Sequence, residues 1–232
     1  MASSLFATRG VDVGVSGVSK TYKMPAEDVQ ALRHIDWEVR QGQAVAIMGP
    51  SGCGKSTLLN LLGGVDRPTS GRVQVDGLDV GGMDERGLEV YRLRRVGFVF
   101  QFYNLIPSIS AIENIELPMI MAGQPEPQSR ERARAILALV GLEHKAYKRP
   151  EELSGGEQQR VGVGLALAND PALILADEPT GNLDSVNADG IARLLVSLAS
   201  EHGKTVIMVS HDANTVAHFP TTYAMRDGQF EA

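Results

Sequence analysis

The chain has 232 residues, of which 22 are Lys or Arg and 28 are Asp or Glu, giving a formal net charge of −6. Hydrophobic residues make up 43% of the sequence, which supports a sizeable core and excludes intrinsic disorder as the main character of the chain. The acidic balance argues against a general nucleic-acid-binding protein, because such proteins carry an excess of basic residues. Aromatic residues, at 5%, are too few for a typical all-β carbohydrate- or peptide-binding protein.

The cysteine content and the hydropathy pattern indicate the compartment. Cys53 is the single cysteine, so no internal disulfide can form and a reducing environment is expected. No apolar run approaches the ~20 residues that span a bilayer, and residues 1–10 lack the apolar centre of a secretory signal. We therefore expect a cytoplasmic protein that would reach a membrane only through a partner.

The first hundred residues carry strand patterns and one helix pattern. Valines that alternate with small or polar residues predict half-buried strands, whereas the continuous apolar run Ala44–Met48 is typical of a strand buried on both faces. In chain order, we predict strands at residues 11–15, 35–39 and 44–48, a helix at Lys55–Leu62, and strands at residues 73–75 and Val96–Phe100.

The middle of the chain changes to a helical pattern, after which the α/β pattern resumes. The predicted elements are two helices within residues 110–142 separated by a turn at 124–127, a helix at about 155–168, a strand at 172–176, a helix at Ser185–Ser200 and a strand at 205–209. The sequence thus predicts one domain. Residues 1–100 and 169–232 form its α/β core, and residues 101–168 form a helical insertion.

Residues 49–56 read Gly-Pro-Ser-Gly-Cys-Gly-Lys-Ser and match the phosphate-loop motif G-x-x-x-x-G-K-[ST] completely. Glycines let backbone N–H groups approach a phosphate chain, and the following helix adds its unsatisfied N–H groups. Lys55 is expected at the β- and γ-phosphates, and the Ser56 hydroxyl on Mg²⁺. A chance glycine turn is the alternative, but it would not need a buried strand before it and a helix after it. The expected nucleotide-binding residues here are Gly49, Pro50, Ser51, Gly52, Cys53, Gly54, Lys55, Ser56 and Thr57.

Two adjacent acids, Asp177 and Glu178, follow the apolar segment 173–176. At a strand end both side chains can reach one cleft. Asp177 is expected to hold Mg²⁺, and Glu178 to polarise the attacking water as the catalytic base. A solvated strand end would explain the pair by itself, but the phosphate loop favours the functional interpretation.

Residues 153–158 read Leu-Ser-Gly-Gly-Glu-Gln. With the phosphate loop and the acid pair, this segment closely resembles the signature of ABC-type ATPases, in the right order over nearly the whole chain. The resemblance implies a P-loop ABC ATPase fold, with a mainly parallel sheet core, an N-terminal antiparallel β subdomain and a helical signature subdomain. It also implies ATP and Mg²⁺ as ligands and an ATP-dependent homodimer. In that dimer the nucleotide of one chain would meet Ser154, Gly155, Gly156 and Glu157 of the other.

Four further positions match the same family. Tyr22 resembles the aromatic residue that stacks on adenine, although a surface tyrosine is a plausible alternative. Gln101 resembles the glutamine at Mg²⁺ and the attacking water, Asp184 the aspartate that communicates across the dimer, and His211 the histidine at the γ-phosphate. The catalytic set implied by the resemblance is Lys55, Gln101, Glu178 and His211.

Residues 98–105, 111–118 and 178–185 resemble the lipoprotein-release (LolD), macrolide-export (MacB) and cell-division (FtsE) ATPases. That resemblance implies an integral membrane partner similar to the permeases FtsX, MacB or LolC, no nucleic-acid partner, and a peripheral position on the inner face of the cell membrane. An exposed apolar patch of Phe102, Tyr103, Leu105 and Ile106 would form the docking surface, unless these residues fill the junction between core and insertion.

Two alternatives and two open points remain. A soluble ABC-type ATPase acting on nucleic acid or ribosomes would need a second cassette, a coiled coil, a zinc module or a basic arm, and a GTPase would need a guanine-reading motif; none is visible.

Where the family usually has alanines and an arginine, this chain has Gly162, Gly164 and Leu165, which predicts a less rigid signature helix. Cys53 is either a reactive thiolate beside Lys55 or a small buried residue.

Overall fold

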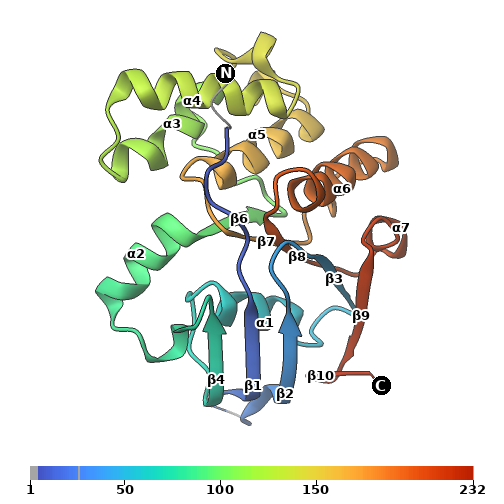
Figure 1. Cartoon of the computed structure of the whole chain (residues 1–232). Coiled ribbons are helices and arrows are strands. Elements are labelled where there is room, and N and C mark those ends of the chain that lie inside the picture. Colours follow the sequence, from blue (N-terminus) through green and yellow to red (C-terminus); the bar gives the residue numbers. More distant parts are fainter. Residues whose placement is uncertain (1–4, 26, 232) are drawn as a thin grey trace.

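Two β-sheets flanked by helices form the architecture (Figure 1). The computed structural model describes residues 5–25 and 27–231. One sheet is antiparallel, with the order β2-β1-β4-β5, and the other has the order β10-β9-β3-β8-β7-β6 and is parallel from β9 to β6. The strands are β1 (Val13–Tyr22), β2 (Val29–Val39), β3 (Ala44–Met48), β4 (Ser70–Val75), β5 (Leu78–Asp79), β6 (Val96–Phe100), β7 (Leu173–Asp177), β8 (Thr205–Ser210), β9 (Thr221–Arg226) and β10 (Gln229–Phe230).

The helices divide into those on the sheets and those of the insertion. Figure 1 shows α3, α4 and α5 gathered at one end of the molecule and β1, β2 and β4 at the other, with the mainly parallel sheet between them. This arrangement confirms the predicted α/β class with a separate antiparallel sheet. The α-helices are α1 (Lys55–Leu62), α2 (Glu85–Arg95), α3 (Ala111–Met121), α4 (Glu126–Leu139), α5 (Gly155–Leu167), α6 (Ser185–Ser200) and α7 (Ala213–Val216), with 3₁₀ turns at Val80–Gly82, Glu143–Lys145 and Pro150–Glu152.

The predicted elements differ from the structure in three respects. The strands predicted at 11–15 and 35–39 extend to ten and eleven residues, as β1 and β2. The segments 73–75 and Val96–Phe100 belong to different sheets, as β4 and β6, and α2 lies between them in the chain. That helix was not predicted, and neither were α7, β5, β9 and β10; α2 is rich in charge and buries little beyond Leu88 and Tyr91.

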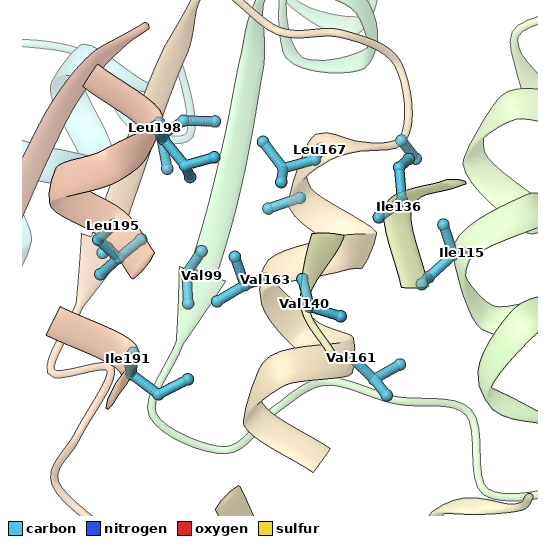
Figure 2. Packing of buried hydrophobic residues seen from close by; sticks show 14 of the residues in the cluster. Val99, Ile115, Ile136, Val140, Val161, Val163, Leu167, Ile191, Leu195 and Leu198 are labelled. Carbon is cyan, nitrogen blue, oxygen red and sulfur yellow. The ribbon is translucent and has the colours of Figure 1, made fainter. Parts of the chain in front are cut away.

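Both faces of the parallel sheet are covered, as the apolar run of β3 predicts. Ala44 and Ala46 pack into the cluster shared with the insertion helices, whereas Val45 and Ile47 pack with α1 and the antiparallel sheet. Figure 2 shows the first cluster, in which α5 lies between the isoleucines of α3 and α4 on one side and the leucines of α6 on the other. The phosphate-loop helix α1 is therefore held between two sheets, and α5 is held by both parts of the chain.

The signature helix α5 is continuous through Gly162 and Gly164. Both glycines stand where neighbouring groups come close. A Cβ on Gly164 would lie 2.8 Å from Cδ1 of Ile115, and a Cβ on Gly162 would lie 3.2 Å from the carbonyl oxygen of Tyr103. The two glycines lower the helix propensity of α5, as expected, but they also let α3 and the loop after β6 pack closely against this helix.

Gly97 sets the distance between β6 and α5. A Cβ at this position would lie 2.3 Å from the carbonyl oxygen of Ala166, which is a backbone atom that cannot swing aside. Since Gln101 follows β6 and the signature motif begins α5, this close approach relates two parts of the candidate site.

We expect Gly97→Ala to lower the free energy of unfolding by about 1–3 kcal/mol, because the added methyl group overpacks the strand–helix contact. Gly14→Ala is the matched control, since Gly14 also lies in a strand and its Cβ would have no heavy atom within 4 Å. The control should be neutral or raise stability by about 0.5–1 kcal/mol. Equilibrium unfolding in urea measures both variants, and equal stabilities would contradict the packing argument.

Candidate active site

The phosphate loop connects β3 to α1 and is shaped by glycines. Gly52 and Gly54 have φ of +80° and +107°, a region that side chains rarely adopt. A Cβ on Gly54 would also lie 2.5 Å from the carbonyl oxygen of Ala31. Gly54 is the N-cap of α1, with no side-chain cap and no acid in the first turn. The first N–H groups of α1 and its positive dipole end are therefore available to an anion.

Lys55 lies over this loop and is only 5% exposed. Its ammonium group donates to the carbonyl oxygens of Gly49 (2.8 Å) and Pro50 (3.0 Å) and lies 3.8 Å from Oε1 of Glu178. Cys53, by contrast, packs into the buried apolar cluster, which favours the small buried residue over the accessible thiolate.

Ser56 and Asp177 meet from different elements. The Ser56 hydroxyl, in the first turn of α1, donates to Oδ1 of Asp177 at the end of β7 (2.9 Å). Burial raises the pKa of Asp177, and the hydrogen bond from Ser56 opposes that shift. No group of three or more His, Cys, Asp or Glu side chains suited to a metal exists among the described residues. This hydroxyl–carboxylate pair fits Mg²⁺, which usually takes one or two protein oxygens and completes its shell with phosphate and water.

Glu178 leaves the strand in the left-handed backbone region, with φ of +47°. Its N–H donates to the carbonyl oxygen of Val209 (3.0 Å), so the turn is anchored on β8. Its Oε2 is 2.9 Å from Nδ1 of His211. This turn brings the Glu178 carboxylate to the same edge of the sheet as Asp177, as expected for the end of a strand.

Gln101 and Tyr22 lie at the borders of this cluster. Gln101 exchanges hydrogen bonds with Asn182, giving one from its side chain to Oδ1 (3.3 Å) and accepting one at its carbonyl oxygen (3.2 Å). The Tyr22 hydroxyl donates to Oδ2 of Asp66 (2.8 Å), and the ammonium group of Lys20 lies 4.8 Å from the ring centroid. Burial and the bond to Asp66 raise the pKa of Tyr22.

Three residues that contact the site, Asn182, Asp66 and Lys20, do not stand out in the sequence. Their contacts join positions from 44 to 81 residues apart in the chain, so no local pattern could have identified them.

The signature motif lies on α5, away from the phosphate loop. Ser154 is the N-cap of this helix, and its N–H donates to Oε2 of Glu157 (2.9 Å), whose other oxygen pairs with Lys145. A Cβ on Gly156 would lie 2.3 Å from Oδ1 of Asn187. In the described part of the chain, no hydrogen bond or ion pair links residues 154–157 to residues 49–57. One chain therefore supplies two separate anion-binding helix ends.

The structure thus brings Lys55, Ser56, Asp177, Glu178 and His211 together at the carboxyl ends of β3, β7 and β8. Gln101 adjoins this cluster through Asn182, and the signature residues stand apart from it. Loops that follow the carboxyl ends of parallel strands are where α/β proteins place their ligands.

Comparison with known proteins gives the family. The family model described as ABC transporter matches residues 32–181. The lipoprotein-releasing system ATP-binding protein LolD of Chromohalobacter salexigens is 44% identical over 92% of this chain and 90% of its own length. The macrolide export ATP-binding/permease protein MacB of Rhodopseudomonas palustris is also 44% identical, over 91% of this chain and 32% of its own length.

A solved structure extends this similarity to three dimensions. The ATP-binding cassette MJ0796 of Methanocaldococcus jannaschii, in a dimeric post-hydrolysis state bound to ADP and Pi, has a TM-score of 0.87 and 43% identity. The match covers 95% of this chain and 97% of that one. The predicted fold and family are confirmed, and the alternative of a nucleic-acid or ribosome factor is not favoured. The chain belongs to the ABC transporter family and is an ATPase cassette of that family.

Proposed function

We propose that this protein is the ATP-hydrolysing subunit of an ABC transporter, in which two copies close head to tail around two Mg²⁺-ATP molecules and drive a membrane permease. The observation that carries this proposal is the cluster of Lys55, Ser56, Asp177, Glu178 and His211, in which a buried cation, a hydroxyl–carboxylate pair and a histidine-paired carboxylate share one edge of the sheet.

Each chain residue has a distinct part in the proposed reaction. The N–H groups of residues 49–57 and the Lys55 ammonium group bind the phosphates, and Tyr22, held by Asp66, stacks on adenine. Ser56 and Asp177, with Gln101 nearby, would hold Mg²⁺, which neutralises phosphate charge when bound. Glu178 accepts the proton of the attacking water, and His211 orients Glu178 and contacts the γ-phosphate.

Glu178→Gln tests the catalytic carboxylate. The amide keeps the size of the side chain but cannot accept the proton, so we expect turnover to fall by about 10²–10⁴-fold. ATP binding and ATP-dependent dimerisation should persist, because Lys55, Ser56 and Asp177 are unchanged. Phosphate release and size-exclusion chromatography with Mg²⁺-ATP measure both properties. Glu89→Gln, on the exposed face of α2, is the control, and parental turnover in Glu178→Gln would show that the base is another group.

A mixing experiment tests the composite site. Ser154→Arg places a bulky cation at the signature and should abolish dimerisation and turnover while leaving ATP binding by the monomer intact. Lys55→Ala should abolish ATP binding. In a mixed dimer of these two variants, one site combines the intact phosphate loop of the first with the intact signature of the second.

We therefore expect the mixture of Ser154→Arg and Lys55→Ala to recover turnover that neither variant has alone. Ser200→Arg, on the exposed end of α6, controls for the added charge. Full activity of Ser154→Arg by itself would mean that the signature does not act across the dimer.

We further propose that residues 101–168 form the subdomain that carries the signature and receives the permease. Phe102 is 72% exposed and Ile106 is 41% exposed, which supports a docking surface after Gln101. Tyr103 and Leu105 are half-buried, and Leu105 packs against the first hydrophobic cluster. The four-residue patch expected from sequence therefore reduces to Phe102 and Ile106. Asn114 holds the loop, because its Oδ1 accepts from Ile106 N (2.7 Å) and its Nδ2 donates to Ile106 O (3.2 Å).

No described helix combines the length and hydropathy needed to cross a bilayer. The relatives support a permease partner, since one belongs to a lipoprotein-releasing system and another is itself an ATP-binding/permease protein. We propose a permease of the lipoprotein-release, macrolide-export or cell-division type, with the ATPase on the inner face of the cell membrane.

Phe102→Asp tests this docking surface. If docking buries the Phe102 ring, a charge in its place should reduce binding to the membrane fraction at least about tenfold. The assay is co-sedimentation of the expressed protein with membranes of its source cells, with nucleotide affinity measured in parallel. Met24→Asp changes another exposed apolar residue, 57% exposed, which follows β1 of the antiparallel sheet, and should retain membrane binding. Equal co-sedimentation of the two variants would rule out docking at Phe102.

A further inference from the structure

A pair of buried hydroxyl groups lies beneath the loops that carry Glu178 and His211. Thr180, two residues after Glu178, is 5% exposed, and Thr215, four residues after His211, is 1% exposed. Their Oγ1 atoms are 3.1 Å apart. The pair joins the loop after β7 to the first turn of α7, and so connects two parts of the cluster that are 35 residues apart in the chain.

The direction of the hydrogen bonds follows from counting hydrogens. The Thr215 hydroxyl donates to Oδ2 of Asp212 (2.6 Å), and a hydroxyl has one hydrogen to give. Thr180 must therefore donate to Thr215. The chain of bonds runs from Thr180 to Thr215 and ends on the Asp212 carboxylate, which also accepts from the N–H groups of Asn214 (3.1 Å) and Thr215 (3.2 Å). Such a chain is polarised toward the charge and is strengthened by it.

The same threonine fixes the turn that presents the acid. Glu178 has the left-handed φ of +47°, which the surrounding structure must hold in place. The turn is closed by Gly181 N on the carbonyl oxygen of Glu178 (3.1 Å) and by Leu183 N on that of Thr180 (3.1 Å). Asn182, the partner of Gln101, lies in this same turn. Movement of Thr180 would therefore move Glu178, and with it the contact to His211.

We propose that Thr180 and Thr215 are positioning residues for ATP hydrolysis, whose hydroxyl chain to Asp212 keeps the Glu178 turn in register with the His211 loop. This rests on the roles proposed above for Glu178 and His211. Packing alone does not require the hydroxyls, because valine has nearly the same shape and would avoid burying polar atoms. What valine cannot supply is the bond that ties one loop to the other.

The test compares Thr180→Val with Thr180→Ser in the full-length protein. Loss of one buried hydrogen bond should lower kcat about fivefold in Thr180→Val. Thr180→Ser keeps the hydroxyl and should recover most of the parental kcat. The affinity for ATP should stay within about twofold of the parental value in both variants, because Thr180 makes no hydrogen bond to the phosphate loop in the described chain. The effect should therefore fall on kcat. Calorimetry with Mg²⁺-ATP and steady-state phosphate release give the two quantities.

Thr205→Val separates positioning from general destabilisation. Thr205 is equally buried, but its hydroxyl bonds Val11 and Gly42 at the opposite end of β8. This variant should lower Tm while leaving kcat at the parental value well below Tm. A kcat for Thr180→Val equal to that of Thr205→Val at matched loss of Tm would overturn the proposal.

Two further variants keep the outcome decisive. If Thr180→Val does not fold, Thr215→Val removes the same bond between the two loops from the other side and should lower kcat in the same direction. A parental kcat in that variant would overturn the proposal. Glu178→Gln, measured alongside, distinguishes the catalytic role of Glu178 from the positioning role of Thr180. If Glu178→Gln is inactive while Thr180→Val is fully active, only the positioning role is wrong. If Glu178→Gln is active, the assignment of Glu178 as the base is itself wrong.

Discussion

The buried ammonium group of Lys55 is the constraint around which the site is organised. A cation that is largely removed from water must be surrounded by oxygen atoms. Here the oxygens are two carbonyls of its own loop and, at 3.8 Å, the carboxylate of Glu178. For the loop carbonyls to reach back to Lys55, the chain must curl tightly after β3. The positive φ at Gly52 and Gly54 makes this possible. The same curl leaves the first N–H groups of α1 without a side-chain cap, so that a phosphate chain can accept hydrogen bonds from them.

A second constraint links this site to the signature helix. Gly97 lets β6 touch the backbone of α5, and Gln159 of α5 donates to the carbonyl oxygen of Phe100 (3.1 Å), directly before Gln101. Gly162 receives the loop after Gln101 against the same helix. A displacement of the exposed Phe102 surface would therefore be felt at the signature helix through packed backbone. Of the α5 glycines that propensity alone marks as weak points, Gly162 lies against this loop and Gly164 lies against Ile115 and Ile136.

The sequence was sufficient for elements whose pattern is local. Ala44–Met48, Lys55–Leu62, Val96–Phe100 and Ser185–Ser200 were predicted with the bounds that the structure has, because continuous or periodic apolar residues mark buried strands and amphipathic helices. The charged helix α2 and the mixed strand β9 bury too few apolar side chains to carry such a pattern, and they form because neighbouring elements pack against them.

The grouping of Asp177 and Glu178 with the phosphate loop also followed from sequence. The left-handed turn at Glu178, the Asp66 contact of Tyr22 and the Thr180–Thr215 pair depend on tertiary contacts, and nothing near them in the sequence predicts them.

In the proposed dimer the signature end of α5 is the part of the site that a second chain supplies. The N–H of Ser154 and an oxygen of Glu157 satisfy each other within the same chain, and the Ser154 hydroxyl accepts from Glu157 N. In its role as acceptor the exposed hydroxyl keeps its own hydrogen, and in the described part of the chain no hydrogen bond from this hydroxyl to another residue is found. In the proposed dimer this hydrogen is available to a phosphate oxygen of the nucleotide that the second chain binds. In the head-to-tail arrangement proposed above, this donor and the positive end of α5 would meet the phosphates bound at Lys55 of the other chain. In the proposed closed dimer each of the two nucleotides lies between the acid pair of one chain and the signature of the other, so the removal of a γ-phosphate changes the electrostatic balance at that site.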